Sequence, residues 1–301
     1  MPHDHDHRHA QPPEGDRRVV AAVSVNIFLT VVQILAGVAA GSLAMIADAI
    51  HNLSDALSLI IALAARKLAR RPADEAMTFG YGRIEVVAAL VNYTTLIVIA
   101  LWLLAEGFLR LFDPLEVQGW IVVIVAILAL VVDLVTAFLT FRLSRQSMNM
   151  RAAFLHNLAD AMGSLALILG GTLVLLFDWR LIDPILTLVI AGYILWLAGL
   201  GLVPAVRLLM LGSPDTPRLQ KVIGDMRAVP GVADLHQVHL WQMQEHASSL
   251  EAHVVLDSTR PASQVRADLK TLLHDRFAIT HSTIELENPD EACRNAPLIG
   301  R

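Results

Sequence analysis

The sequence has few charged residues and a single cysteine. Asp, Glu, Lys and Arg make up 17% of its 301 residues, whereas hydrophobic residues make up 55%. A soluble globular chain carries about 25% charged residues, and the apolar excess here lies before residue 212. We therefore expect a membrane domain followed by a soluble tail domain. Cys293 alone excludes an intrachain disulfide and a thiolate-rich metal site, and a formal net charge of −5 argues against nucleic acid as a partner.

The N-terminus lacks the basic segment and apolar core of a cleavable signal peptide. It begins instead with polar residues that include His3, His5, His7 and His9. This composition is typical of a disordered tail with metal affinity, which we place at residues 1–18. A neutral polar leader, similar to an expression tag, is the alternative interpretation.

Six apolar stretches follow, each near or above the ~20 residues that span a bilayer. They lie at about Val19–Ala40, Leu43–Ala65, Val86–Leu111, Trp120–Phe141, Ala152–Phe177 and Leu181–Leu211. Together they predict an all-α membrane bundle of six helices over residues 19–211. The loops after the second and fourth stretches are rich in arginine, whereas the opposite loops have only Arg110 and Arg180 as basic residues. By the positive-inside rule the arginine-rich loops, and with them both termini, are cytoplasmic.

A small α+β domain is predicted after the last apolar stretch, which ends near Pro214. Helical spacing follows Pro217, strands are predicted at Val232–Met243, Leu250–Asp257 and Thr283–Glu287, and Pro261 opens a second helix. The order α-β-β-α-β suits a cytoplasmic, ferredoxin-like domain with its helices on one face of a sheet. We place this domain at residues 212–290 and a disordered tail at 291–301. A domain of about 80 residues is small, so dimerisation would help its stability.

One hexapeptide occurs twice within the apolar stretches. His51-Asn52-Leu53-Ser54-Asp55-Ala56 returns as His156-Asn157-Leu158-Ala159-Asp160-Ala161, and no other histidine lies in these stretches. A histidine and an aspartate four residues apart share one face of a helix. Two such helices facing each other would gather two imidazoles and two carboxylates, which is a four-ligand cage for a divalent metal such as zinc. The predicted ligands are His51, Asp55, His156 and Asp160.

The chemistry of this cage favours transport. Ionisable side chains inside a membrane bundle usually mark an ion or proton path, although Asp133, which is alone in its stretch, suits a structural role equally well. Imidazole ligands favour Zn²⁺, Co²⁺ or Cd²⁺ over Mg²⁺, Ca²⁺ and Mn²⁺. Because the ligands must be deprotonated to bind metal, protons compete with the metal. A cage exposed alternately to each side of the membrane would then exchange metal for protons.

Further motifs carry a resemblance to a known family. They are Gly41-Ser42-Leu43-Ala44, Ala47-Asp48-Ala49-Ile50-His51 with Asp55, Arg71-Pro72-Ala73-Asp74, Thr78-Phe79-Gly80-Tyr81-Gly82-Arg83, His156 with Asp160, and His239-Leu240-Trp241. The chain resembles the cation diffusion facilitators, in their zinc-exporting branch, over nearly all of residues 17–288. The resemblance implies six helices, a cytoplasmic metallochaperone-like domain, a homodimer in the bacterial inner membrane, and proton-driven export of zinc, with Cd²⁺ or Co²⁺ as further substrates. The transport-site ligands of the family match the four residues of the cage, and a histidine at position 51 implies a preference for zinc.

The resemblance also implies metal sites outside the membrane. Relatives bind metal in the tail domain at positions that match His236, His253 and Glu287. Strand alternation places His253 on a polar face, whereas His236 has the parity of Val238 and Leu240, which suits a ligand only at the entrance of the strand. The alternative tail ligands are His239, His246, His274 and His281. Some relatives bind a second metal through histidines in the loop before the third span, where this chain has Met77 and Tyr81, so we assign no site there.

Two other classes of function remain as alternatives. A membrane-embedded zinc enzyme would keep an open metal position and a general base, as in H-E-x-x-H, and the sequence has neither, so we expect no enzyme. A metal-sensing scaffold that binds metal without moving it is compatible with the sequence. The expected partners are membrane lipid, divalent metal ions, protons as counter-ions, and a second copy of the chain.

Overall fold

The computed structural model describes residues 13–144, 148–244, 247–290, 292–293 and 296–300. Side chains are not described at helical residues 13–26, 58–59, 62–63, 66, 139–144, 148–153 and 155–156. The predicted histidine-rich segment from His3 to His9 therefore lies outside the described residues, as does His246.

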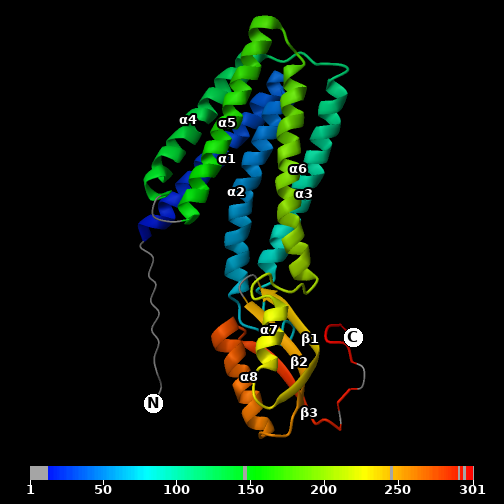
Figure 1. Cartoon of the computed structure of the whole chain (residues 1–301). Helices are drawn as coiled ribbons and strands as arrows, with labels where there is room; N and C mark the ends of the chain where they lie inside the picture. The colour runs from blue at the N-terminus through cyan, green and yellow to red at the C-terminus, as the bar shows by residue number, and fades with distance from the viewer. Residues whose placement is uncertain (1–12, 145–147, 245–246, 291, 294–295, 301) are drawn as a thin grey trace. The chain divides into compact units, whose positions relative to one another are not determined.

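Before residue 212, the described residues form six long helices, each over one of the predicted apolar stretches. Figure 1 labels them. They are α1 (Pro13–Ala40), α2 (Leu43–Ala69), α3 (Ile84–Arg110), α4 (Gly119–Ser144), α5 (Met148–Phe177) and α6 (Ile182–Leu209). Residues 13–18, which we expected in a disordered tail, belong to α1. Within the described residues, four segments are long and apolar enough to cross a membrane: Ile84–Arg110, Gly119–Phe138, Asn157–Phe177 and Ile182–Leu209. Ile27–Ala40 is a shorter apolar helix.

The chain forms two compact units. The first contains the residues up to Ile61 together with Asn92–Gly199, and the second contains Ala62–Val91 and the chain from Leu200 onward. Helices α2, α3 and α6 therefore each contribute residues to both units.

In the first unit, α4 and α5 pack along each other. Glycine allows their backbones to approach, because a Cβ atom on Gly119 of α4 would lie 2.6 Å from the carbonyl oxygen of Gly171 of α5. A buried apolar cluster joins the turn between α1 and α2 to these helices; it contains Ala40, Ala44, Met45, Val122, Ala126 and Leu167. A second cluster joins α2, α3 and α6 and contains Leu43, Ala47, Leu103 and Ala191.

A polar connection fixes the start of α2. Gly41 makes the turn after α1 with φ +71°, a conformation that glycine adopts without steric cost. Ser42 then caps α2, since its hydroxyl accepts a hydrogen bond from the Met45 N–H at 3.1 Å. Asp183, at the first turn of α6, accepts from the Ser42 hydroxyl at 2.5 Å and from the Leu43 N–H at 2.9 Å. The turn between α1 and α2 is thus connected to α6 by a carboxylate.

The second unit contains a small α+β domain with a three-stranded sheet. Its elements are α7 (Leu219–Arg227), β1 (Val232–Gln244), β2 (Ala247–Leu256), α8 (Ala262–Phe277) and β3 (His281–Glu287). The strand order is β1-β2-β3, with β1 antiparallel and β3 parallel to β2. Apolar residues of α7 and α8 and one face of the sheet form the core, among them Met226, Leu235, Leu250, Val254 and Leu269. The predicted order of helices and strands agrees with the structure.

The chain after β3 returns to β1, which differs from our expectation of a disordered tail at 291–301. The carbonyl oxygens of Pro297 and Leu298 accept hydrogen bonds from the N–H groups of Gln237 and Val238 at 3.0 and 2.9 Å. Leu298 also packs against the tail core. These contacts meet β1 at an irregularity, where Gln237 has φ +47° and the pairing with β2 shifts between His236 and His239.

Candidate metal centres

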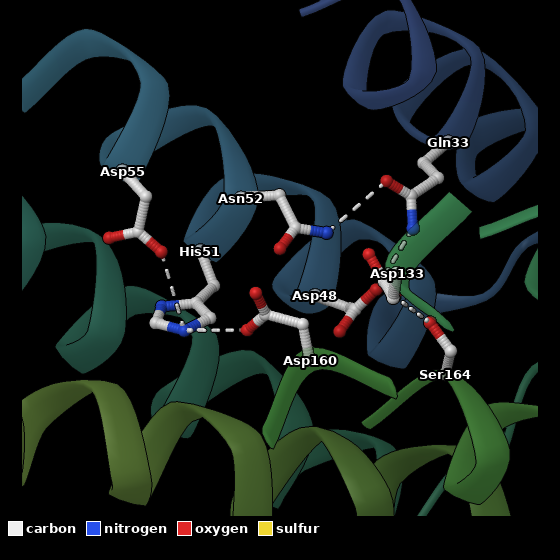
Figure 2. Close-up of polar contacts among 8 residues, drawn as sticks. All are labelled: Gln33, Asp48, His51, Asn52, Asp55, Asp133, Asp160 and Ser164. Atoms are coloured by element: carbon white, nitrogen blue, oxygen red, sulfur yellow. Dashed lines mark hydrogen bonds and ion pairs between the residues drawn. The ribbon is translucent and has the colours of Figure 1, made fainter. Parts of the chain in front are cut away.

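The membrane candidate site lies between α2 and α5 in the first unit. The Nε2 atom of His51 is 3.7 Å from Oδ2 of Asp55 and 3.8 Å from Oδ1 of Asp160 (Figure 2). His51 and Asp55 are neighbours because residues four apart share a helix face, whereas Asp160 comes from the facing helix. The structure therefore brings together three of the four residues that the repeat predicts.

The fourth predicted ligand is His156, whose side chain lies outside the described side chains. Its backbone is in α5, one turn before Asp160, which is the same relation that His51 has to Asp55. Zinc bonds of about 2.0–2.2 Å place tetrahedral ligand atoms roughly 3.4 Å apart. The separations of 3.7 and 3.8 Å from His51 are close to that requirement.

The side chains of this site are largely buried but remain partly exposed. The exposed side-chain fractions are 16% for His51, 34% for Asp55 and 11% for Asp160. The His51 ring also has an edge contact with the Tyr193 ring of α6, at 6.0 Å between centroids. An imidazole held between two carboxylates and an aromatic ring has few orientations left, so its nitrogen is directed at the acids. Tyr193 was not predicted, because a tyrosine in an apolar helix has no distinctive spacing.

A second group of polar side chains lies beside the candidate ligands. The Gln33 amide of α1 donates to Oδ2 of Asp48 at 2.9 Å and its oxygen accepts from Asn52 at 3.4 Å. Ser164 of α5 donates to Oδ2 of Asp133 at 3.1 Å. Figure 2 shows both pairs near Asp160. Asp48 and Asp133 were noted from the sequence, whereas their amide and hydroxyl partners Gln33 and Ser164 were missed. Polar residues within apolar helices could have indicated these two partners.

The tail candidate site brings together all three residues that the family resemblance implies. Nδ1 of His253 is 2.6 Å from Oε1 of Glu287, and Nε2 of His236 is 3.3 Å from Oε2 of the same carboxylate. The two imidazole rings lie 5.1 Å apart between centroids. Glu287 therefore lies between the two histidines, with one oxygen toward each.

Irregular pairing in β1 explains why His236 reaches this site. His236 pairs with His253 across the sheet, but His239 pairs with Glu251, so the alternation changes between them. Strict alternation had assigned His236 to the apolar face of Val238 and Leu240. The bulge at Gln237 removes that conflict, because an extra residue in one strand reverses which side chains face inward.

The electrostatics of Glu287 favour the ionised carboxylate. Burial alone would raise its pKa, but hydrogen bonds from His253 and from the Cys293 N–H, together with the nearby imidazoles, hold the pKa below the usual 4.5. An ionised, buried carboxylate between two imidazoles has the charge and ligand type of a zinc site.

Two more side chains lie at this site, and the sequence did not predict them as ligands. Ligand atoms of His253, Glu285 and Glu287 lie within 4.8 Å of one another, as do those of His236, Glu287 and Cys293. Among the alternative tail histidines, His274 is exposed and pairs with Asp275 at 2.7 Å. The ring of His281 contacts Phe79 at 6.5 Å.

Comparison with known proteins defines the class of protein. Residues 19–210 match the family described as cation efflux transmembrane domain, and residues 214–289 match the cation efflux protein, cytoplasmic domain. The chain belongs to the cation efflux family, which confirms the resemblance noted from its motifs. It is a multi-pass membrane protein of a transporter family and not of an enzyme family.

Individual relatives match along almost their whole length. The metal cation efflux system protein CzcD of Cupriavidus metallidurans is 34% identical over 95% of this chain and 89% of its own. The cadmium, cobalt and zinc/H(+)-K(+) antiporter of Bacillus subtilis is 30% identical, covering 95% and 94%. Zinc transporter ZitB of Escherichia coli is 31% identical, covering 95% and 93%. Among solved structures, the metal-bound C-terminal domain of the CzcD transporter has 38% identity and a TM-score of 0.22, covering 23% of this chain and 96% of that one.

Proposed function

We propose that this cation efflux protein exports zinc from the cytoplasm in exchange for protons, by alternating access. The observation that carries the proposal is the gathering of His51, Asp55 and Asp160 from two membrane helices. Imidazole and carboxylate together suit Zn²⁺, and Cd²⁺ and Co²⁺ are further substrates because they accept the same ligands. The names of the relatives, which include zinc, cadmium, cobalt and H(+), agree with this assignment.

The ligand set explains the coupling to protons. We assign His51, Asp55, His156 and Asp160 as the four transport ligands, which leave no open position for a reacting water. The His51 nitrogen lies near two carboxylates, so a proton on the ring and a metal ion among the ligands compete for the same acids. Metal release on one side of the membrane then accompanies proton uptake by the ligands.

The proposed arrangement has six membrane spans in residues 19–211 and both termini in the cytoplasm of a bacterium, with the chain in the inner membrane. Six long helices in that region and the arginine-rich loops support it. We assign residues 212–290 to a cytoplasmic ferredoxin-like domain, and Pro297 and Leu298 extend it through their hydrogen bonds to β1.

The cytoplasmic domain is proposed to form a homodimer and to bind metal at His236, His253 and Glu287. Helices α7 and α8 cover one face of its sheet, and the other face carries His253 and Glu251, so a second copy can pack there. The cluster around Glu287 also favours a second role, in which metal binding in the cytoplasm regulates the membrane helices. A scaffold that senses metal without transporting it is the extreme form of that role.

Zinc flux into proteoliposomes tests the proposal and separates it from the scaffold. We expect wild-type protein to move Zn²⁺ and to respond to an imposed pH gradient, and we expect His51→Ala to abolish the flux. His274→Ala is the matched control, because it removes an exposed histidine outside both candidate sites. Absence of flux from the wild type would leave the sensing scaffold, and flux indifferent to the pH gradient would refute proton coupling.

A further inference from the structure

The lone cysteine of the chain lies against the tail candidate site. Ligand atoms of His236, Glu287 and Cys293 lie within 4.8 Å of one another. His236 and Glu287 are buried, and Cys293 is exposed. Ligand atoms around zinc are roughly 3.4–3.7 Å apart, given Zn–N bonds near 2.0 Å and Zn–S bonds near 2.3 Å. A rotamer adjustment of about 1 Å is therefore enough for all three to reach one ion.

The buried imidazole supplies independent support for a ligand at this position. The side chain of His236 is 7% exposed, and its Nε2 atom has no hydrogen-bond partner in the described part of the chain. It faces Oε2 of Glu287 at 3.3 Å without the geometry of a hydrogen bond. Buried polar atoms normally have a hydrogen-bond partner, and an exception is explained by a bound water, a bound ion or local strain. A metal ion bound to Nε2 would satisfy it.

The backbone holds the cysteine over this nitrogen. The Cys293 N–H donates to Oε2 of Glu287 at 3.3 Å, and a few residues later Pro297 and Leu298 bond to the bulge of β1. The segment that carries the thiol is thus attached on one side to the carboxylate and on the other to the strand that presents His236.

We propose that Cys293 is a thiolate ligand of the cytoplasmic metal site, together with His236 and Glu287. The inference rests on the proposed metal binding by the tail domain. His253 or a water completes four-coordination. A thiolate makes the site softer than imidazole and carboxylate alone, so it favours Zn²⁺ and Cd²⁺ over harder cations. Binding releases the thiol proton to solvent and forms a metal–sulfur bond, with no change of oxidation state. The bond also fixes the C-terminal segment on β1.

Cobalt substitution of the full-length protein in detergent tests the proposal directly. Cobalt bound to a thiolate shows an intense near-ultraviolet charge-transfer band, which imidazole and carboxylate ligands do not give. Since the chain has one cysteine, any such band reports Cys293. We expect the band in wild-type protein, its loss in Cys293→Ser and in His236→Ala, and its retention in His274→Ala. A wild type without the band overturns the proposal.

Two companion measurements separate this inference from the proposed function. Bound-metal stoichiometry that falls in His236→Ala while no thiolate band forms would keep the cytoplasmic site and reject Cys293. Zinc flux that persists in Cys293→Ser would leave the transport proposal intact in either case. Alkylation of Cys293 should also slow by about tenfold when free Zn²⁺ is about ten times its Kd, because labelling follows the unbound fraction. Unchanged labelling at saturating zinc would contradict ligation.

Discussion

The hydrogen bonds between Ser42 and Asp183 provide a prediction whose size follows from the structure. Asp183 accepts from the Ser42 hydroxyl at 2.5 Å and from the Leu43 N–H at 2.9 Å, and both side chains are buried. Ser42 also caps α2, the helix that carries His51. Loss of this connection would therefore loosen the start of the ligand-bearing helix.

The expected energies can be bounded. Hydrogen bonds to charged groups contribute about 1.5–3 kcal/mol, whereas coupling energies of hydrogen bonds between membrane helices average about 0.6 and reach about 1.7 kcal/mol. A short bond to a carboxylate belongs at the upper end of the membrane range. We predict a coupling energy of about 1.5 kcal/mol between Ser42→Ala and Asp183→Ala. Ser42→Ala alone should also lose the helix cap, which contributes about 1 kcal/mol.

A double-mutant cycle measures this coupling, with reversible unfolding in mixed detergent and denaturing micelles as the assay. The control cycle pairs Asp183→Ala with Thr136→Ala, because Thr136 lies in α4 roughly 25 Å along the helix from its start. The control pair should be additive within about 0.5 kcal/mol. If the Ser42–Asp183 cycle is equally additive, the hydrogen bond between α2 and α6 does not contribute to stability, which would refute the prediction.

Three further predictions concern packing and pH. Gly119→Ala should destabilise the protein by about 1–3 kcal/mol in thermal unfolding, because its Cβ would lie 2.6 Å from the Gly171 carbonyl. Gly192→Ala should instead stabilise α6 by about 0.5–1 kcal/mol, because among the described residues no atom outside its own stretch of helix lies within 4 Å of the added carbon. Equal effects of the two substitutions would contradict the packing. Hydrogen bonds from the Thr259 hydroxyl and N–H hold the pKa of Asp257 below 3.8. That contribution to stability is present above pH 3.8 and is lost as pH falls through the folded-state pKa. Thr259→Val should therefore reduce resistance to denaturant near neutral pH and have no effect in acid. A difference between wild type and Thr259→Val that stays constant with pH would refute this.

The membrane candidate site could be predicted from the sequence because its ligands follow helical spacing. A repeated histidine and aspartate four residues apart fix their own relation within one helix, and the apolar surroundings indicate that the helices lie in a membrane. The meeting of α2 with α5 was an assumption, because spacing within each helix does not determine which helices face each other. The structure places Asp160 3.8 Å from His51, so the two helices do meet there.

The tail candidate site depended on features that alternation does not reveal. The bulge at Gln237 gives His236 a different face from the one its parity predicts. Cys293 was considered only as evidence against a thiolate-rich site, since its position next to Glu287 depends on the chain turning back after β3. Contacts between residues that are distant in sequence and joined by irregular backbone leave no periodic pattern in the sequence from which they could be predicted.

The tie between Ser42 and Asp183 was missed for a similar reason. Each residue alone is ordinary, because serine is a common helix cap and aspartate is common in the first turn of a helix. Their contact spans 141 residues of sequence, and only the packing of α2 against α6 brings them together.

The central claim is that the two hexapeptides form one zinc site. Zinc transport in proteoliposomes by His51→Ala, His156→Ala and the double variant tests it most directly, with reconstitution levels matched. One shared site predicts that each single substitution abolishes transport and that the double variant is no worse, because residues that act as a unit are not additive. Substantial zinc transport by His156→Ala, with the remainder lost only in the double variant, would show two independent sites and contradict the account.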